Sequence, residues 1–193
     1  MAKTRAPGTA DRILDVAERL VQLRGFNAFS YRDIAEQIGI RGPSIHYHFP
    51  SKDDLGVALV ERYREQFAQA CTHIDRKART VSDRLRRFAA LFRATLERGN
   101  RMCLCGMLAA ELSTLSEPIQ LGVQGFWSDC ERWLAGALED GRETGELSFR
   151  GDSARRAAVV LAGLEGAMLA ARVADDPGKF ERIARTLLDE LTA

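Results

Sequence analysis

Apolar residues recur at the spacing of an α-helix along nearly the whole 193-residue chain, and this periodicity constrains the fold more than any other feature. Ile13, Ala17 and Leu20 form one such stripe, and a stripe with the same spacing lies near the far end, within 180–191. The alternation of apolar and polar residues that is typical of half-buried strands is missing. The sequence therefore predicts an all-α fold of about nine helices.

The charge balance excludes one class of nucleic-acid binder. Lys and Arg total 28 and Asp and Glu total 27, so the net charge is only +1. The chain is therefore no polycation, and any DNA binding must come from a local surface. The four cysteines are too few and too irregularly spaced for a disulfide framework, which indicates a reducing compartment. They are Cys71, Cys103, Cys105 and Cys130.

Neither a signal peptide nor a membrane span is expected. The N-terminal stretch carries Lys3 and Arg5 but is followed by charge instead of a continuous apolar segment. The most apolar stretch, 157–171, is interrupted by Glu165 and is too short to cross a bilayer. We therefore expect a cytoplasmic protein with no membrane partner.

Two short helices near the N-terminus have the dimensions of a helix-turn-helix. They are expected near 31–38 and 42–48 and are joined at Gly39. Ile45 and Phe49 lie four residues apart and can face the core, which turns the polar residues of the second helix outward. A rod of this size fits the major groove of DNA.

The outward residues of the second helix supply donors, acceptors and flat rings, which suit base edges and phosphates. They are Arg41, Ser44, His46, Tyr47 and His48. Lys52, at the start of the next helix, would meet a phosphate together with the N–H groups of that helix. The alternative is that these side chains are simply the solvated face of a small helix.

The segment 9–59 resembles the DNA-binding domain of the TetR family of bacterial repressors. The stretch FNAFSYRDIAEQIGIRGPSIHYHFPSKDDL follows the family pattern, including Phe26, the Tyr47-His48-Phe49 run and the Ser51-Lys52 pair. The resemblance implies a helix-turn-helix head, residues 1–52, and a helical body, residues 53–193, for ligand sensing and dimerisation.

Residue by residue, the resemblance implies DNA contacts from the second short helix and its neighbours. These are Arg41, Gly42, Pro43, Ser44, His46, Tyr47 and His48, with Lys52 on the backbone and Lys3 and Arg5 on a phosphate or the minor groove. Many relatives carry Tyr where this chain has His46, so its base preference is its own. Residues 1–50 hold seven Lys/Arg and five acids. Because one head is only mildly basic, we expect two heads to bind together to the two half-sites of a pseudo-palindromic operator.

The segment AAVVLAGLEGAMLAARVA is apolar nearly all round and must be buried as a helix. Gly163 and Gly166 permit close approach of another backbone. Burial within one subunit is one interpretation, and the TetR resemblance implies the other, a homodimer formed by the last two helices. Glu165 and Arg172 share a face of this helix, and pairing with each other is the simplest expectation.

Cys103 is the candidate sensing residue. It is expected in the first turn of the sixth helix, where free N–H groups, Arg98 and Arg101 favour a thiolate. Residues 100–150 also resemble a subset of TetR regulators in which a Cys opens this helix and several members respond to electrophiles or oxidants. Two alternatives stay open: all four cysteines are small buried hydrophobes, or the inducer is a reversibly bound lipophilic or acyl compound.

The body is also expected to hold a ligand pocket, although the same aromatic and Met residues would suit a plain core. Its expected lining is Phe88, Phe92, Met107, Trp127, Met168 and Arg172. An enzyme is disfavoured because neither a metal-ligand cluster nor a Ser/His/Asp arrangement is legible, so no cofactor or metal is expected. The overall hypothesis is a repressor that a small-molecule or electrophile inducer releases from its operator.

Overall fold

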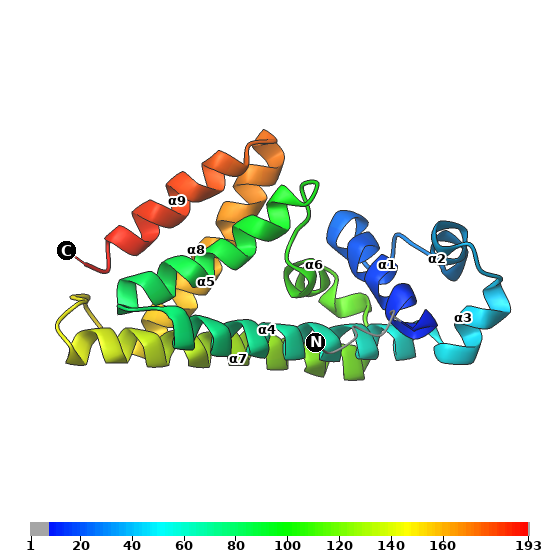
Figure 1. Cartoon of the computed structure of the whole chain (residues 1–193), viewed down its shortest axis with the longest axis horizontal. Helices are drawn as coiled ribbons and strands as arrows, with labels where there is room; N and C mark the ends of the chain where they lie inside the picture. The colour runs from blue at the N-terminus through cyan, green and yellow to red at the C-terminus, as the bar shows by residue number, and fades with distance from the viewer. Residues whose placement is uncertain (1–7, 193) are drawn as a thin grey trace, which may run out of the picture.

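The computed structural model describes residues 8–192, which form nine α-helices and one short 3₁₀ turn (Figure 1). The helices are α1 (Thr9–Arg24), α2 (Tyr31–Ile38), α3 (Gly42–His48), α4 (Lys52–Lys77), α5 (Val81–Glu97), α6 (Leu104–Ala110), α7 (Glu117–Glu143), α8 (Ser153–Ala174) and α9 (Pro177–Asp189). The turn covers Leu112–Thr114. The all-α prediction is confirmed.

The molecule is elongated along α4 and α7, which run side by side (Figure 1). Helices α1, α2 and α3 gather at one end, and α5, α8 and α9 pack together at the other. Helix α6 contacts α1, α4 and α7 and so lies at the junction. The expected boundary between residues 52 and 53 falls at the start of α4, which contacts both α1 in the head and α7 in the body.

The head is held together by a small apolar core. Ile13, Ile34 and Ile45, one from each of its helices, are fully buried, and Leu55 of α4 joins them. Helix α2 ends at Gly39, whose φ of +69° lies in the left-handed region that favours glycine. This turn directs the chain into α3 and fixes the angle between the two short helices.

Helix α8 is the one described helix that is long and apolar enough to cross a membrane by length and composition, with a mean hydropathy of 1.6. The core helix of a soluble protein passes the same test. Here Val160, Leu161 and Leu164 are buried, and the helix packs between α7 and α9. Its apolar composition therefore has a structural role within the body.

Candidate functional site

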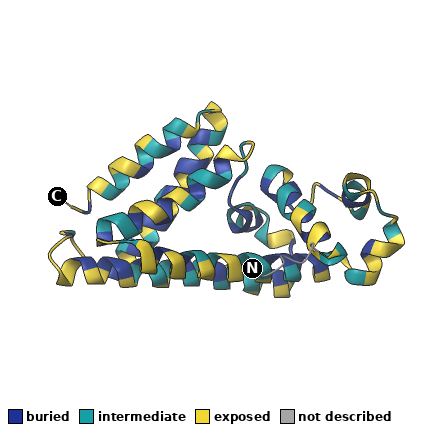
Figure 2. Ribbon diagram, in the orientation of Figure 1, coloured by how far each residue is buried: buried dark blue, intermediate teal, exposed yellow. Residues whose placement is uncertain are grey.

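Helix α3 carries an exposed polar face at the end of the head (Figure 2). Ile45 and Phe49 anchor the helix in the core, with exposed fractions of 0% and 8%. Of the outward residues expected from the sequence, Gly42 and His48 are half-buried. The others are exposed, namely Arg41, Pro43, Ser44, His46 and Tyr47. We call these residues the α3 face; Pro43, Ser44, Tyr47 and His48 line one hollow on it, whereas His46 packs toward α2.

Aromatic contacts hold two rings of the α3 face in place. The His46 ring packs on Tyr31 with centroids 4.8 Å apart, and its Nδ1 lies 3.2 Å from the Pro50 carbonyl oxygen. The Tyr47 ring meets His48 edge to face at 5.2 Å and is otherwise 84% exposed. Tyr47 therefore presents most of its ring to solvent on the α3 face.

Lys52 lies differently from the sequence-based expectation. Its ammonium group donates to the Phe29 carbonyl oxygen at 2.5 Å and sits over the rings of Phe26 and Phe29, 4.8 and 4.5 Å from their centroids. Burial lowers the pKa of this lysine. The ammonium is thus engaged inside the head, because the turn after α1 offers it a carbonyl and two rings. Lys3 and Arg5, the other expected backbone contacts, lie outside the described residues.

A second candidate site surrounds Cys103 in the body. This residue is the N-cap of α6, just before the helix, and is 2% exposed. It lines a cavity of about 260 Å³ with walls from α4, α5, α7 and α8. The other lining residues are Tyr63, Gln66, Phe67, Ala70, Leu91, Phe92, Ala94, Thr95, Arg98, Phe126 and Met168. The walls are mainly apolar and aromatic, as in sites for small organic ligands.

The expected thiolate at Cys103 is wrong for the resting protein. Burial raises the pKa of the thiol well above its usual value, and the nearby Glu165 raises it further. The Gly106 N–H donates to Sγ at 3.4 Å and lowers the pKa, but it does not offset the desolvation. Cys103 is therefore a neutral thiol until something removes its proton.

Glu165 and Arg172 do not pair with each other. The Arg172 guanidinium donates to the Leu23 carbonyl oxygen of α1 at 2.6 Å and lies 3.5 Å from the Met107 sulfur. Glu165 is only 8% exposed, and its Oε1 has no hydrogen-bond partner. Burial raises the pKa of this carboxyl group to about 7. The sequence signal that could have identified this buried acid is that Glu165 interrupts an otherwise apolar helix.

Two of the six expected pocket residues, Phe92 and Met168, line the cavity. Phe88 is fully buried and stacks on Trp133, with centroids 5.1 Å apart. Met107, Trp127 and Arg172 also lie outside the lining. The difference arises because helical periodicity identifies the inner face of each helix. It does not show which inner residues pack tightly against their neighbours and which line a cavity. Tyr63 and Phe67 lie four residues apart on α4, so periodicity alone marks them only as inner-face residues.

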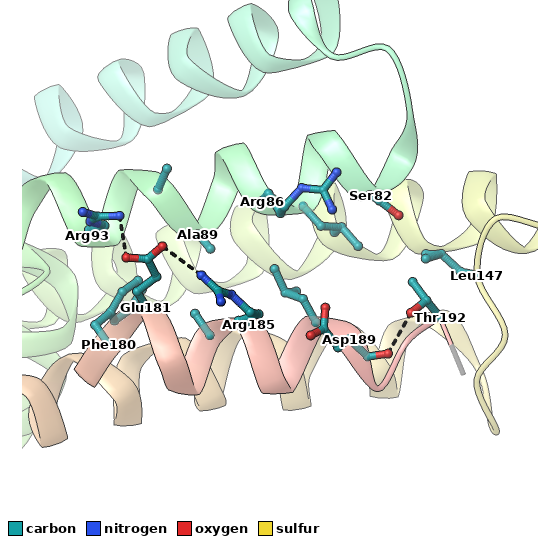
Figure 3. Close-up of a pocket in the computed structure, with 14 residues that line it drawn as sticks. Ser82, Arg86, Ala89, Arg93, Leu147, Phe180, Glu181, Arg185, Asp189 and Thr192 are labelled. Atoms are coloured by element: carbon teal, nitrogen blue, oxygen red, sulfur yellow. Dashed lines mark hydrogen bonds and ion pairs between the residues drawn. The ribbon is translucent and has the colours of Figure 1, made fainter. Parts of the chain in front are cut away.

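Another hollow, of about 210 Å³, lies between α5 and α9 (Figure 3). Glu181 lies at its side and pairs with Arg93 at 2.8 Å and with Arg185 at 3.2 Å. This hollow has no lining residue from α4 or from the head. The Cys103 cavity does include α4, so it is the better placed of the two to influence the α3 face.

Helix α6 also ties the body to the head through Glu111. The Glu111 carboxylate accepts from the backbone N–H of Phe26 at 2.5 Å and from that of Asn27 at 3.3 Å. Gly25, which precedes them, has a φ of +93°, and a Cβ there would lie 2.8 Å from the same carboxylate. Because Cys103 begins α6 and Glu111 follows its end, one seven-residue helix connects the cavity to the turn after α1.

Replacing Glu111 by alanine is expected to lower the free energy of unfolding by about 1 to 3 kcal/mol, because it leaves the Phe26 N–H without its partner. Urea unfolding followed by circular dichroism measures this change. Glu61→Ala, an exposed acid on α4, is the matched control and should change stability by less than about 0.5 kcal/mol. Equal effects of the two substitutions would contradict the proposed tie.

Comparison with known protein families gives two matches that together span most of the chain. Residues 13–59 match the family described as bacterial regulatory proteins, tetR family. Residues 81–187 match the family described as tetracyclin repressor-like, C-terminal domain. Among curated proteins, the HTH-type transcriptional repressor NemR of Escherichia coli is 28% identical over 179 residues, 90% of this chain and 88% of NemR.

Solved structures share the fold over almost the full length. A TetR-family transcriptional regulator from Agrobacterium tumefaciens superposes with a TM-score of 0.92 at 34% identity, covering 95% of this chain and 97% of that chain. The reduced form of E. coli NemR gives a TM-score of 0.82 at 27% identity, again covering 95% and 97%.

Proposed function

This chain belongs to the TetR family of bacterial regulatory proteins, and from that premise we propose that it is a transcriptional repressor. Members of this family are DNA-binding regulators that typically form homodimers and respond to small molecules. We propose that this protein binds a pseudo-palindromic operator as a homodimer in the cytoplasm. An inducer then acts at the Cys103 cavity and releases it from DNA.

The observation that carries the DNA-binding proposal is the α3 face. Ser44, Tyr47 and His48 line one hollow beside a short helix that Ile45 anchors in the core, and Arg41 and His46 are exposed next to them in the chain. Their hydroxyl, imidazole and guanidinium groups suit base edges and phosphates in a major groove. The Lys52 ammonium, held inside the head, contributes by fixing the start of α4 next to α3.

Replacing Tyr47 by alanine is expected to weaken operator binding about tenfold or more, since one good groove contact contributes about 1 to 3 kcal/mol. Thermal stability should stay unchanged because this side chain is 84% exposed. Fluorescence anisotropy on a duplex selected from a random pool by the native protein measures the affinity. Leu121→Ala, an exposed apolar residue on α7, is the control. Native affinity in the Tyr47 variant would contradict the assignment.

The homodimer proposal rests on an uncovered apolar stripe along α8. Val159, Ala162, Gly166, Leu169 and Val173 are exposed and follow one another at intervals of three and four residues. That spacing is typical of a helix seam that packs against another helix. Helix α9 lies beside α8, so two copies would bring four helices together.

The two glycines of α8 differ in a way that supports the same interface. A Cβ on Gly163 would meet Leu187 of α9 at 2.6 Å, whereas a Cβ on Gly166 would meet nothing within 4 Å. Gly163 therefore serves packing within the subunit. We assign Gly166 to close approach of the partner copy.

The inducer proposal favours covalent chemistry at Cys103. The Cys103 thiol lines the cavity. The solved NemR structure, which has the same fold, is described as a reduced form. The cavity walls also suit the second candidate, a reversibly bound apolar molecule, because aromatic side chains from α4, α5 and α7 surround it. They are Tyr63, Phe67, Phe92 and Phe126.

Two connections would carry the signal to DNA. Helix α4 supplies Tyr63 and Phe67 to the cavity and begins next to α3. Helix α6 directly follows Cys103 and is followed by Glu111, which binds the turn after α1. A shift of either helix would change the distance between the two α3 faces of a dimer. Those faces must match successive major grooves about 34 to 36 Å apart.

A further inference from the structure

We propose that Glu165 is the proton acceptor of the Cys103 thiol when this thiol adds to an electrophile that enters the cavity. The inference rests on the proposed role of Cys103 as the sensor. It adds a residue and a reaction step to that role.

The position of Glu165 is unusual for a structural residue. It lies on α8 with 8% exposure, between the buried Leu164 and the buried Met168, the latter a residue of the cavity wall. No arginine or lysine pairs with it among the described residues, and its Oε1 has no hydrogen-bond partner. Burying a carboxyl group without a counter-charge is costly, so its retention in an apolar helix needs an explanation.

The neighbours of Glu165 supply that explanation. Its carboxyl group interacts with the Cys103 thiol and raises the pKa of that thiol. Its Oε2 lies 2.5 Å from the point where a Cβ on Gly106 would stand, so any larger residue there would push the carboxyl group away. The N–H of the same Gly106 donates to Sγ of Cys103 at 3.4 Å. One glycine thus brings the acid and the thiol together.

The remaining contacts of Sγ can stabilise the negative charge that forms when the proton leaves. The Tyr63 hydroxyl of α4 lies 3.8 Å from Sγ as a donor, and the Gly106 N–H, in the first turn of α6, donates to Sγ at 3.4 Å. The other titratable or charged groups nearby are Tyr63 and Arg64 of α4, Arg98 at the cavity wall, Cys105 of α6 and Cys130 of α7. Glu165 is the acceptor among them.

The step is an addition without change of total oxidation state. With N-ethylmaleimide as the electrophile, the Cys103 proton moves to the Glu165 carboxylate while the sulfur lone pair bonds to the β-carbon of its C=C bond. The electron pair of the C=C bond moves onto the carbonyl oxygen as an enolate. The enolate α-carbon then takes the proton from Glu165, which leaves a thioether on Cys103 and regenerates the carboxylate. Thiol activation by an adjacent base is the general logic of such nucleophiles.

The pH dependence follows from the same pair. Burial raises the pKa of Glu165 to about 7, so the group is a carboxylate above this pH and a protonated acid below it. Only the carboxylate can accept the thiol proton. The reaction rate at Cys103 should therefore fall as the pH drops through about 7.

Alkylation of the full-length protein by N-ethylmaleimide, followed at Cys103 by tandem mass spectrometry, tests the proposal. Glu165→Gln keeps the shape of the side chain but cannot accept a proton, so we expect the rate at pH 7.5 to fall tenfold or more and the inflection near pH 7 to vanish. Glu165→Asp keeps the carboxylate, but its shorter side chain holds the carboxylate farther from Sγ. Cys103 in this variant should therefore also react slowly. Glu143→Gln, at an exposed end of α7, should behave as the native protein.

Native rate and native pH profile in Glu165→Gln would overturn the proposal, and so would a native rate in Glu165→Asp if the Gln variant does not fold. A gel-shift assay on the same samples separates this outcome from failure of the sensor role. If Glu165 controls alkylation but the alkylated protein stays on DNA, the thiol–carboxyl pair stands and the sensor proposal fails.

Discussion

Replacing Cys103 by serine is expected to abolish the release of the protein from operator DNA by N-ethylmaleimide. The hydroxyl group of serine has nearly the shape of the thiol but does not add to a maleimide at neutral pH. Cys103 lines the cavity beside α4 and precedes α6, both of which reach the head. In a gel-shift titration the native complex should dissociate, while the variant complex should persist at tenfold or higher reagent concentration.

Cys71→Ser is the matched control for this experiment. Cys71 is also buried on α4, but it does not line the cavity, and burial raises its pKa to about 12. This variant should release DNA as the native protein does. If Cys103→Ser is released at the native concentration, the thiol proposal is wrong and reversible binding in the same cavity becomes the leading explanation. Thermal shifts with uncharged apolar compounds would then test it.

Replacing Gly166 by leucine is expected to convert the dimer into a monomer and to weaken operator binding a hundredfold or more. Within one subunit a side chain at this position meets open space, so the fold should be kept. In the proposed dimer the same side chain would separate α8 from its copy along the exposed stripe. Two separate heads, each only mildly basic, lose the benefit of binding both half-sites together.

Light scattering at micromolar concentration measures the mass, and anisotropy measures the affinity. Gly136→Leu is the matched control, because Gly136 is also an exposed helical glycine with open space around its Cβ position, but it lies on α7. It should remain dimeric with native affinity. A dimeric mass for Gly166→Leu would show that the interface lies elsewhere.

Much of the fold could be predicted because its signals are local. The spacing of Ile13, Ala17 and Leu20 predicts a helix wherever that segment lies, and Gly39 ends α2 by its own backbone conformation. The α3 face could be predicted for the same reason, since the anchors Ile45 and Phe49 determine which side of a short helix turns outward.

The sequence by itself thus determined the helices, the helix-turn-helix and the family. Only the tertiary structure decided the protonation state of Cys103. The N-terminus of α6 favours a thiolate at Cys103, yet the residues that desolvate this thiol come from helices far apart in the chain, and burial prevails. Lys52 is directed inward by the Phe29 carbonyl oxygen, which lies in a different segment of the chain. Glu165 lacks its expected partner because Arg172 binds the Leu23 carbonyl oxygen of α1 instead. Helical periodicity shows which residues face inward, whereas the pKa of a side chain depends on which other residues it meets there.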